Sequence, residues 1–135
     1  RFKMSLENLL LKVQEFQEAF QDYKEANPNT SHEEEYNLRY KLMCEETDEY
    51  LEACKQKDIV EIADALADQL YILLGTINTH GLQHIIEDLF NEVHRSNMSK
   101  LGADGKPIRR EDGKVLKGPG YSEPDLESIL MSAKK

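Results

Sequence analysis

The chain has 135 residues, a length that suits one domain with a buried core. Its net charge of −9 argues against a general nucleic-acid-binding protein, because such proteins present a basic surface. Its two cysteines, Cys44 and Cys54, form neither a CxxC motif nor a disulfide framework. No apolar run reaches the roughly 18 residues of a membrane-spanning helix, and the acidic N-terminal segment is unlike a signal peptide. We therefore expect a cytoplasmic protein that binds neither nucleic-acid polymers nor membranes.

The charge is distributed unevenly along the chain. Residues 1–99 carry a net charge of −11, whereas residues 100–117 carry a net charge of +3. An acidic body followed by a basic segment suits a site that combines a metal ion with phosphate groups. A solvated loop would have the same composition, so the charge distribution alone does not decide between the two.

Hydrophobic periodicity predicts four helices in the first 100 residues. Ser5 opens the first helix, and Asn27-Pro28 ends it. Thr30 or Ser31 forms a capping box for the second helix. The expected helices span about residues 5–27, 31–56, 58–80 and 82–98.

The third and fourth helices have clear boundaries in the sequence. Asp58 is a candidate N-cap for the third helix, and His80-Gly81 is typical of a helix C-terminus. The fourth helix then follows from Leu82 to about Met98. Since all the connections are short, the elements predict an all-α protein with an antiparallel four-helix bundle.

The pattern changes after residue 100. Two copies of Asp-Gly-Lys occur at 104–106 and 112–114, and Asp-Gly between apolar and basic residues predicts a hairpin. Ser122 should cap a short terminal helix that starts near Pro124. We therefore assign residues 1–100 to the helical bundle. Residues 101–135 form a C-terminal extension of the same domain, made of a hairpin arm and a short helix.

The third predicted helix combines an acidic stripe with an apolar surface. Glu61, Asp64 and Asp68 fall within an arc of roughly 60° on a helical wheel. The other faces are apolar, and a helix that is apolar nearly all round is buried inside a domain or at a subunit contact. Buried carboxylates cost several kcal/mol each unless a cation meets them. The stripe therefore predicts a bound cation.

The second predicted helix carries a matching acidic cluster. Glu46 lies at the edge of its apolar stripe and Glu49 about 60° further round, so both are candidate inward ligands. Glu45 is a weaker candidate, and Glu52 is expected to be exposed. Two facing helices would thus supply five carboxylates to one pocket.

Oxygen ligands without paired His or Cys fit Mg²⁺, with Mn²⁺ as the alternative. A carboxylate-bridged di-iron bundle would need Glu-x-x-His on two helices, and the sequence contains none. The competing interpretation is that the acids form solvated faces or i,i+4 pairs. That interpretation is preferred for residues 33–35, Glu45 and Glu52, and it is weaker for the stripe of the third helix.

These motifs resemble those of the all-α nucleoside triphosphate pyrophosphohydrolases, a superfamily that includes MazG-like proteins, phosphoribosyl-ATP pyrophosphohydrolase and the dimeric dUTPases. Residues 46–50, Glu-Thr-Asp-Glu-Tyr, are similar to the first motif of the superfamily. Residues 61–64, Glu-Ile-Ala-Asp, are similar to the second. The resemblance covers roughly residues 5–100. The segment 93–100 followed by the Asp-Gly-Lys arm looks like a MazG-like subgroup with a C-terminal extension.

The resemblance implies Mg²⁺-dependent hydrolysis of a nucleoside triphosphate between its α- and β-phosphates, which yields a nucleoside monophosphate and pyrophosphate. The implied metal ligands are the five acids of the two motifs. Either Glu46 or Glu49 is the implied proton acceptor, and a polar or basic group from the fourth helix would hold the phosphates. The metal ligands are Glu46, Glu49, Glu61, Asp64 and Asp68, and the phosphate-binding candidates are Asn97, Lys100 and Arg95.

The phosphate-binding candidates have an alternative as a solvated helix end, where basic residues complement the helix dipole. The resemblance also implies a homodimer or homotetramer, and the apolar third helix supports at least a dimer. Two other functions stay open at this stage. One is phosphoribosyl-ATP pyrophosphohydrolase itself, and the other is a non-catalytic helical interaction module with a degenerate metal site. The sequence fixes neither the preferred base or sugar nor the number of metal ions.

Overall fold

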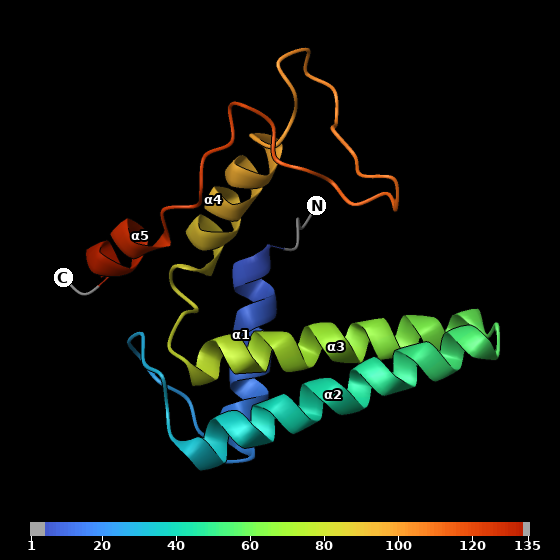
Figure 1. Ribbon diagram of the computed structural model, residues 1–135. Coiled ribbons are helices and arrows are strands. Elements are labelled where there is room, and N and C mark those ends of the chain that lie inside the picture. The colour runs from blue at the N-terminus through green and yellow to red at the C-terminus, as the bar shows by residue number, and fades with distance from the viewer. Residues whose placement is uncertain (1–4, 134–135) are drawn as a thin grey trace. The chain divides into compact units, whose positions relative to one another are not determined.

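The computed structural model describes residues 5–133 of the chain, and these residues form helices without any β-strand. This confirms the predicted all-α helical class. No helix within the described range is long and apolar enough to cross a lipid bilayer. The helices are α1 (Leu6–Ala19), α2 (Glu33–Lys55), α3 (Ile59–Thr79), α4 (Ile86–Met98) and α5 (Leu126–Ala133) (Figure 1).

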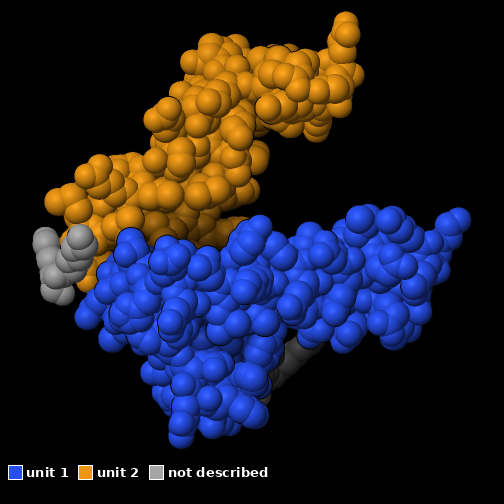
Figure 2. Space-filling model, turned by 60° about the horizontal axis from the view of Figure 1, so that its bottom comes forward, with its two compact units in different colours: residues 1–84 blue, residues 85–135 orange. Residues whose placement is uncertain are grey.

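The chain divides into two compact units (Figure 2). Unit 1 extends to residue 84 and contains α1, α2 and α3. Unit 2 starts at residue 85 and contains α4, the arm and α5. The predicted boundary between bundle and extension at residue 100 stays a prediction.

Unit 1 is built on an antiparallel pair formed by α2 and α3, which lie side by side, with α1 packed across α3 (Figure 1). A tight turn at residues 56–58 joins α2 to α3, and Lys57 adopts a φ of 55° there. The side chain of Asp58 accepts hydrogen bonds from the backbone N–H groups of Val60 and Glu61, at 3.1 and 3.2 Å. Asp58 therefore caps α3 as the sequence predicts.

The buried apolar residues of unit 1 are few, and α3 contributes only Ala65 and Leu74. Leu66, Leu70 and Leu73 follow each other at i, i+4 and i+7, and each is nearly half exposed, at 49%, 46% and 47%. One copy of the chain therefore leaves an apolar stripe of α3 in contact with solvent.

Two helix ends differ from the prediction because the backbone leaves helical geometry early. The first helix ends at Ala19 rather than at Pro28, since Gln21 adopts a φ of 58° and the Asp22 N–H closes onto the Gln17 carbonyl at 2.7 Å. At the start of α2 the N-cap is His32, which makes no side-chain capping bond. The predicted cap Ser31 has a φ of 66° and belongs to the preceding turn.

The connection between α3 and α4 is longer than expected. Gly81, with a φ of 66°, ends α3 as predicted. The Leu82 N–H then bonds back to the Ile77 carbonyl at 3.0 Å. Leu82 is therefore part of the capping structure of α3, and α4 begins only at Ile86.

The arm in unit 2 is a hairpin held by few bonds. The Arg110 N–H donates to the Lys114 carbonyl at 2.8 Å, the Leu116 N–H donates to the Ile108 carbonyl at 2.7 Å, and one isolated antiparallel bridge pairs Arg109 with Val115. The two Asp-Gly-Lys segments form the same turn, because the Asp side chain accepts from the N–H of the Lys in each.

The terminal helix begins at Leu126 rather than near Pro124. Ser122, the predicted cap, instead donates its backbone N–H to the Ser99 hydroxyl at 2.9 Å. The carboxylate of Asp125 accepts from the Ser128 N–H at 3.2 Å and so takes the capping role.

Candidate functional site

Hydrogen bonds between α2 and α3 set which residues of the two helices face each other. Gln69 donates to the Thr47 hydroxyl at 3.3 Å, and the Arg39 guanidinium donates to the Thr76 hydroxyl at 3.1 Å. In this antiparallel register Glu46 comes opposite Asp68. The acidic motifs of the two helices are thereby brought onto one seam.

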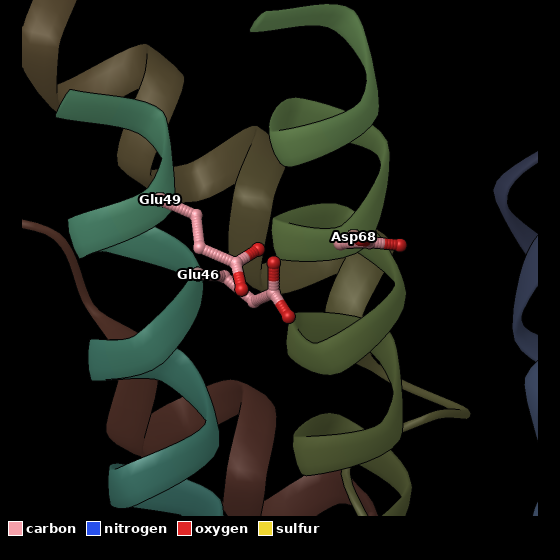
Figure 3. Close-up of side chains that lie close together, drawn as sticks. All are labelled: Glu46, Glu49 and Asp68. Atoms are coloured by element: carbon pink, nitrogen blue, oxygen red, sulfur yellow. The ribbon is translucent and has the colours of Figure 1, made fainter. Parts of the chain in front are cut away.

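Three carboxylates meet on this seam (Figure 3). One oxygen atom from each of Glu46, Glu49 and Asp68 lies within 4.8 Å of the others. Glu46 and Glu49 extend from α2 toward α3, which carries Asp68 (Figure 3). Glu46 and Asp68 are half-buried, and Glu49 is exposed.

The proximity of these acids changes their protonation. Burial is the largest cause that raises the pKa of Glu46, to about 7, followed by hydrogen bonding to Glu49 and the charges of Glu49, Asp68 and Asp64. Burial and the charges of Asp64 and Glu49 also raise the pKa of Asp68. The cluster therefore resists carrying its full negative charge when no cation is bound.

The acidic seam continues toward the α2–α3 turn as an open groove of about 570 Å³. Glu49 lines this groove together with Glu61 and Asp64, and so belongs to both the cluster and the groove. All five predicted ligands thus lie along one seam, but Glu61 and Asp64 are exposed rather than buried as the apolar character of α3 predicted. Glu52 and Asp58 also line the groove and were not predicted to be part of the site. The three-residue spacing of Glu46, Glu49 and Glu52 was an available signal for Glu52.

The residues present fit a divalent cation. No Lys or Arg forms an ion pair with any acid of the seam within residues 5–133. The Glu46 Oε2 atom is buried and has no hydrogen-bond partner in the described part of the chain. A buried, unpartnered carboxylate oxygen is costly, and a bound cation would remove that cost. An all-oxygen donor set suits Mg²⁺ or Mn²⁺.

The predicted phosphate-binding residues lie in unit 2, at and just beyond the C-terminal end of α4. Arg95 forms a two-pronged ion pair with Glu92, at 2.7 and 2.9 Å, and also donates to the Glu123 carbonyl at 3.1 Å. Its Nε and Nη2 atoms are therefore engaged within unit 2, while the residue remains exposed. Asn97 is exposed and Lys100 is half-buried.

The architecture defines the class of protein: an all-α protein in which two antiparallel helices gather carboxylates on a shared seam. The sequence profile of the family described as "Phosphoribosyl-ATP pyrophosphohydrolase" matches residues 13–97, well over half of the chain. The chain belongs to this family, within the all-α MazG-like superfamily, and at a coarse level it is a hydrolase of phosphoanhydride bonds.

The similar solved structures include the "putative NTP pyrophosphohydrolase" from Exiguobacterium sp. 255-15. The two chains share 26% sequence identity, the match covers 93% of this chain and 95% of that chain, and the TM-score is 0.49. A search of curated proteins gave no match.

Proposed function

We propose that the protein is a Mg²⁺-dependent nucleoside triphosphate pyrophosphohydrolase that cleaves the α–β phosphoanhydride bond and releases a nucleoside monophosphate and pyrophosphate. The observation that carries this proposal is the cluster of Glu46, Glu49 and Asp68, whose oxygens lie within 4.8 Å of one another without a cationic partner in residues 5–133. Membership of the phosphoribosyl-ATP pyrophosphohydrolase family supports the same chemistry.

In this proposal the five carboxylates of the seam, Glu46, Glu49, Glu61, Asp64 and Asp68, hold Mg²⁺, or Mn²⁺ in its place. Bound divalent ions supply charge neutralisation at the phosphates and acidify a water molecule. Either Glu46 or Glu49 accepts the proton of the attacking water, because a carboxylate that is not fully used as a ligand acts as a general base. Asn97, Lys100 and Arg95 are the proposed phosphate-binding residues, and Arg95 holds Glu92 through its Nε and Nη2 atoms.

The experiment is an incubation of the full chain with a panel of NTPs and dNTPs plus Mg²⁺, in which pyrophosphate and monophosphate are both measured. We expect stoichiometric release of the two products, lost on addition of a chelator and in Asp64→Asn. Glu45→Gln is the matched control, since Glu45 is an exposed acid of the same helix that is absent from the cluster. Absence of release from every nucleotide would support the alternative of a non-catalytic interaction module.

A comparison of Glu46→Gln with Glu49→Gln separates the ligand role from the base role. If a residue acts mainly as the base, its Gln variant should lose turnover but keep its Mg²⁺ affinity. If a residue acts mainly as a metal ligand, its Gln variant should lose both turnover and Mg²⁺ affinity. Titration of Mg²⁺ against each variant, with turnover measured at saturating metal, distinguishes these outcomes.

A second candidate function is hydrolysis of phosphoribosyl-ATP, because the matching family carries that name. The reaction chemistry is the same and only the substrate differs. Adding phosphoribosyl-ATP to the nucleotide panel decides between the two, since the preferred substrate will show the higher kcat/KM.

We also propose that the protein works as a homodimer or a homotetramer. The apolar stripe of Leu66, Leu70 and Leu73 on α3 supports this, since apolar patches of this kind mark interaction surfaces. Light scattering coupled to gel filtration should give a mass of two or four chains, and Leu70→Glu should shift it toward one chain.

A further inference from the structure

The arm contains the same tight turn twice, once around each Asp-Gly-Lys segment, and neither copy has a part in the proposed function. The first copy spans residues 102–106. The Gly105 N–H donates to the Gly102 carbonyl at 2.9 Å, and the Gly102 N–H donates to the Lys106 carbonyl at 2.8 Å. The Asp104 carboxylate accepts from the Lys106 N–H at 3.0 Å. Asp104 is thus held between the two closing bonds of the turn.

The second copy, residues 110–114, repeats each of these bonds. The Gly113 N–H donates to the Arg110 carbonyl at 2.9 Å, and the Arg110 N–H donates to the Lys114 carbonyl at 2.8 Å. The Asp112 carboxylate accepts from the Lys114 N–H at 3.1 Å. The backbone therefore holds the two aspartates in the same way, and the chain offers a comparison of one tripeptide in two settings.

The residue that opens the turn differs between the two copies. In the second copy it is Arg110, whose Nε and Nη2 atoms donate to the two carboxylate oxygens of Asp112 at 3.1 and 2.5 Å. In the first copy it is Gly102, which has no side chain. A Cβ atom added at Gly102 would lie 3.1 Å from Asp104 Oδ1, so this position faces the aspartate there too. Within residues 5–133 Asp104 forms no ion pair, whereas Asp112 is held by a guanidinium.

An aspartate that precedes a glycine is open to a rearrangement of its own backbone. The glycine nitrogen attacks the aspartate Cγ, because glycine has no side chain to obstruct the approach. A C–N bond forms, and the carboxyl hydroxyl leaves with the amide proton as water. Water then opens the succinimide ring at one of its two carbonyls. Opening at Cγ restores aspartate, and opening at the backbone carbonyl gives isoaspartate, so the composition of the chain is unchanged.

Both Asp-Gly steps have the space that this ring needs. A Cβ atom added at Gly105 or at Gly113 would meet no other atom within 4 Å, and both aspartates are exposed. Both glycines have a positive φ, 76° and 87°. The attacking nitrogen also donates one hydrogen bond of the same length in each turn. Backbone geometry and access therefore favour neither site over the other.

The contact with Arg110 opposes the reaction at Asp112 in two ways. Loss of water requires a protonated carboxyl group, and Arg110, followed by the Lys114 N–H, lowers the pKa of Asp112. The two-pronged contact also restrains the rotation that brings Cγ toward the Gly113 nitrogen. Both side chains of the pair are more than half exposed, at 54% and 57%, so water weakens the contact and the protection is partial.

From this comparison we propose that Asp104 is a site of isoaspartate formation in the folded protein, and that Arg110 protects Asp112 from the same modification. Water is the only co-reactant. The product carries one additional methylene group in its main chain, which alters the turn that leads into the hairpin. This inference is independent of the proposed hydrolysis, since none of the acids of the seam belongs to the arm.

The test is storage of the full-length protein at neutral pH and physiological temperature, with samples taken over several weeks. A protease that cleaves before aspartate but not before isoaspartate then reports each site, and mass spectrometry gives the fraction left uncleaved. We expect Asp104 to convert at least about threefold faster than Asp112, a ratio in keeping with a solvent-exposed ion pair. Equal rates, faster conversion at Asp112, or no conversion at Asp104 would overturn the proposal.

The same measurement in guanidinium chloride separates the effect of the folded turn from that of the local sequence. Both sites read Asp-Gly-Lys, so their rates should become nearly equal once the chain is unfolded. A difference that persisted in the unfolded chain would show that the contact with Arg110 is not its cause.

One substitution tests the protecting residue directly. Arg110→Gln should raise the conversion of Asp112 to about the rate of Asp104, and should leave Asp104 unchanged. Lys114→Gln is the matched control, because it removes one positive charge from the same turn and its side chain forms no ion pair with Asp112 in the described part of the chain. Unchanged conversion of Asp112 in Arg110→Gln, or equal acceleration in Lys114→Gln, would contradict the role given to Arg110.

Discussion

The two ends of the α2–α3 seam differ in how their polar side chains are paired. Near the contact with α1, the Gln17 amide donates to the Gly75 carbonyl at 3.1 Å and accepts from Asn78 at 2.9 Å. At the other end, Glu46, Glu49 and Asp68 repel each other, and an oxygen of Glu46 has no partner within the described residues. The first cluster is satisfied by the protein itself except for the Asn78 Oδ1 atom, which is buried without a partner in the described residues, whereas the second gathers carboxylates that repel one another and so favours a bound cation. Groups that a fold leaves unsatisfied point to function more directly than groups that it pairs.

The largest expected effect comes from removing a charge at the unsatisfied end. Asp68→Asn should reduce turnover by about 100-fold or more, equivalent to about 2.7 kcal/mol in the barrier. The same change should leave the stability of the metal-free protein equal or higher, because it removes a repelling carboxylate. Turnover and thermal unfolding measured on the same preparation test this. Loss of activity together with lower stability of the metal-free protein would instead show that Asp68 is needed for the fold.

At the hydrogen-bonded end near α1 we expect the substitution to reduce stability. Gln17→Ala removes two buried hydrogen bonds, to Gly75 and from Asn78, and should lower the free energy of unfolding by about 2 kcal/mol. Urea denaturation measures the loss. Gln14→Ala is the control, since Gln14 bonds only to Glu18 on the exposed surface and should change stability little. Equal stabilities of the two variants would contradict the distinction between the ends.

Mg²⁺ should stabilise the folded protein through the carboxylate cluster, and the hydrogen bonds of Gln17 should not affect this stabilisation. At a Mg²⁺ concentration of about ten times Kd, stability should rise by about 1.4 kcal/mol through binding to the folded state alone. Thermal unfolding with Mg²⁺ and with chelator measures the increase. Glu49→Gln should reduce it, while Gln17→Ala should keep the full increase from its lower starting stability.

The smallest expected effect concerns the ion pair between Glu92 and Arg95 in unit 2. The Arg95 guanidinium, and then the backbone N–H of Asp125, lower the pKa of Glu92 to about 2. Because this pKa is below the ordinary value of 4.5, the contact stabilises above about pH 4.5 and is lost as pH falls through about 2. Hydrogen exchange of the Asp125 N–H should therefore become faster as the solution is acidified, after correction for the intrinsic rate. Glu92→Gln should remove that pH dependence.

The sequence alone determined the helical class, the Asp58 and Gly81 ends of α3, and the type of chemistry that the acids of α2 and α3 favour. These features depend on local periodicity, capping and residue type, which are legible without tertiary contacts. The sequence missed the early end of α1 and the late start of α4, because positive φ values at Gln21 and the capping bond of Leu82 are set by backbone geometry.

Only the tertiary structure decided which acids meet. Helical wheels placed Glu61, Asp64 and Asp68 on one stripe, but the register between α2 and α3 selects Asp68 to join Glu46 and Glu49. The same register brings the Arg39 guanidinium against α3, where it donates to the Thr76 hydroxyl and the Ile72 carbonyl, and no sequence motif predicts this contact. The pairing of two helices depends on contacts between residues far apart in the sequence, such as those of Arg39 with Ile72 and Thr76. Local sequence patterns therefore cannot predict it.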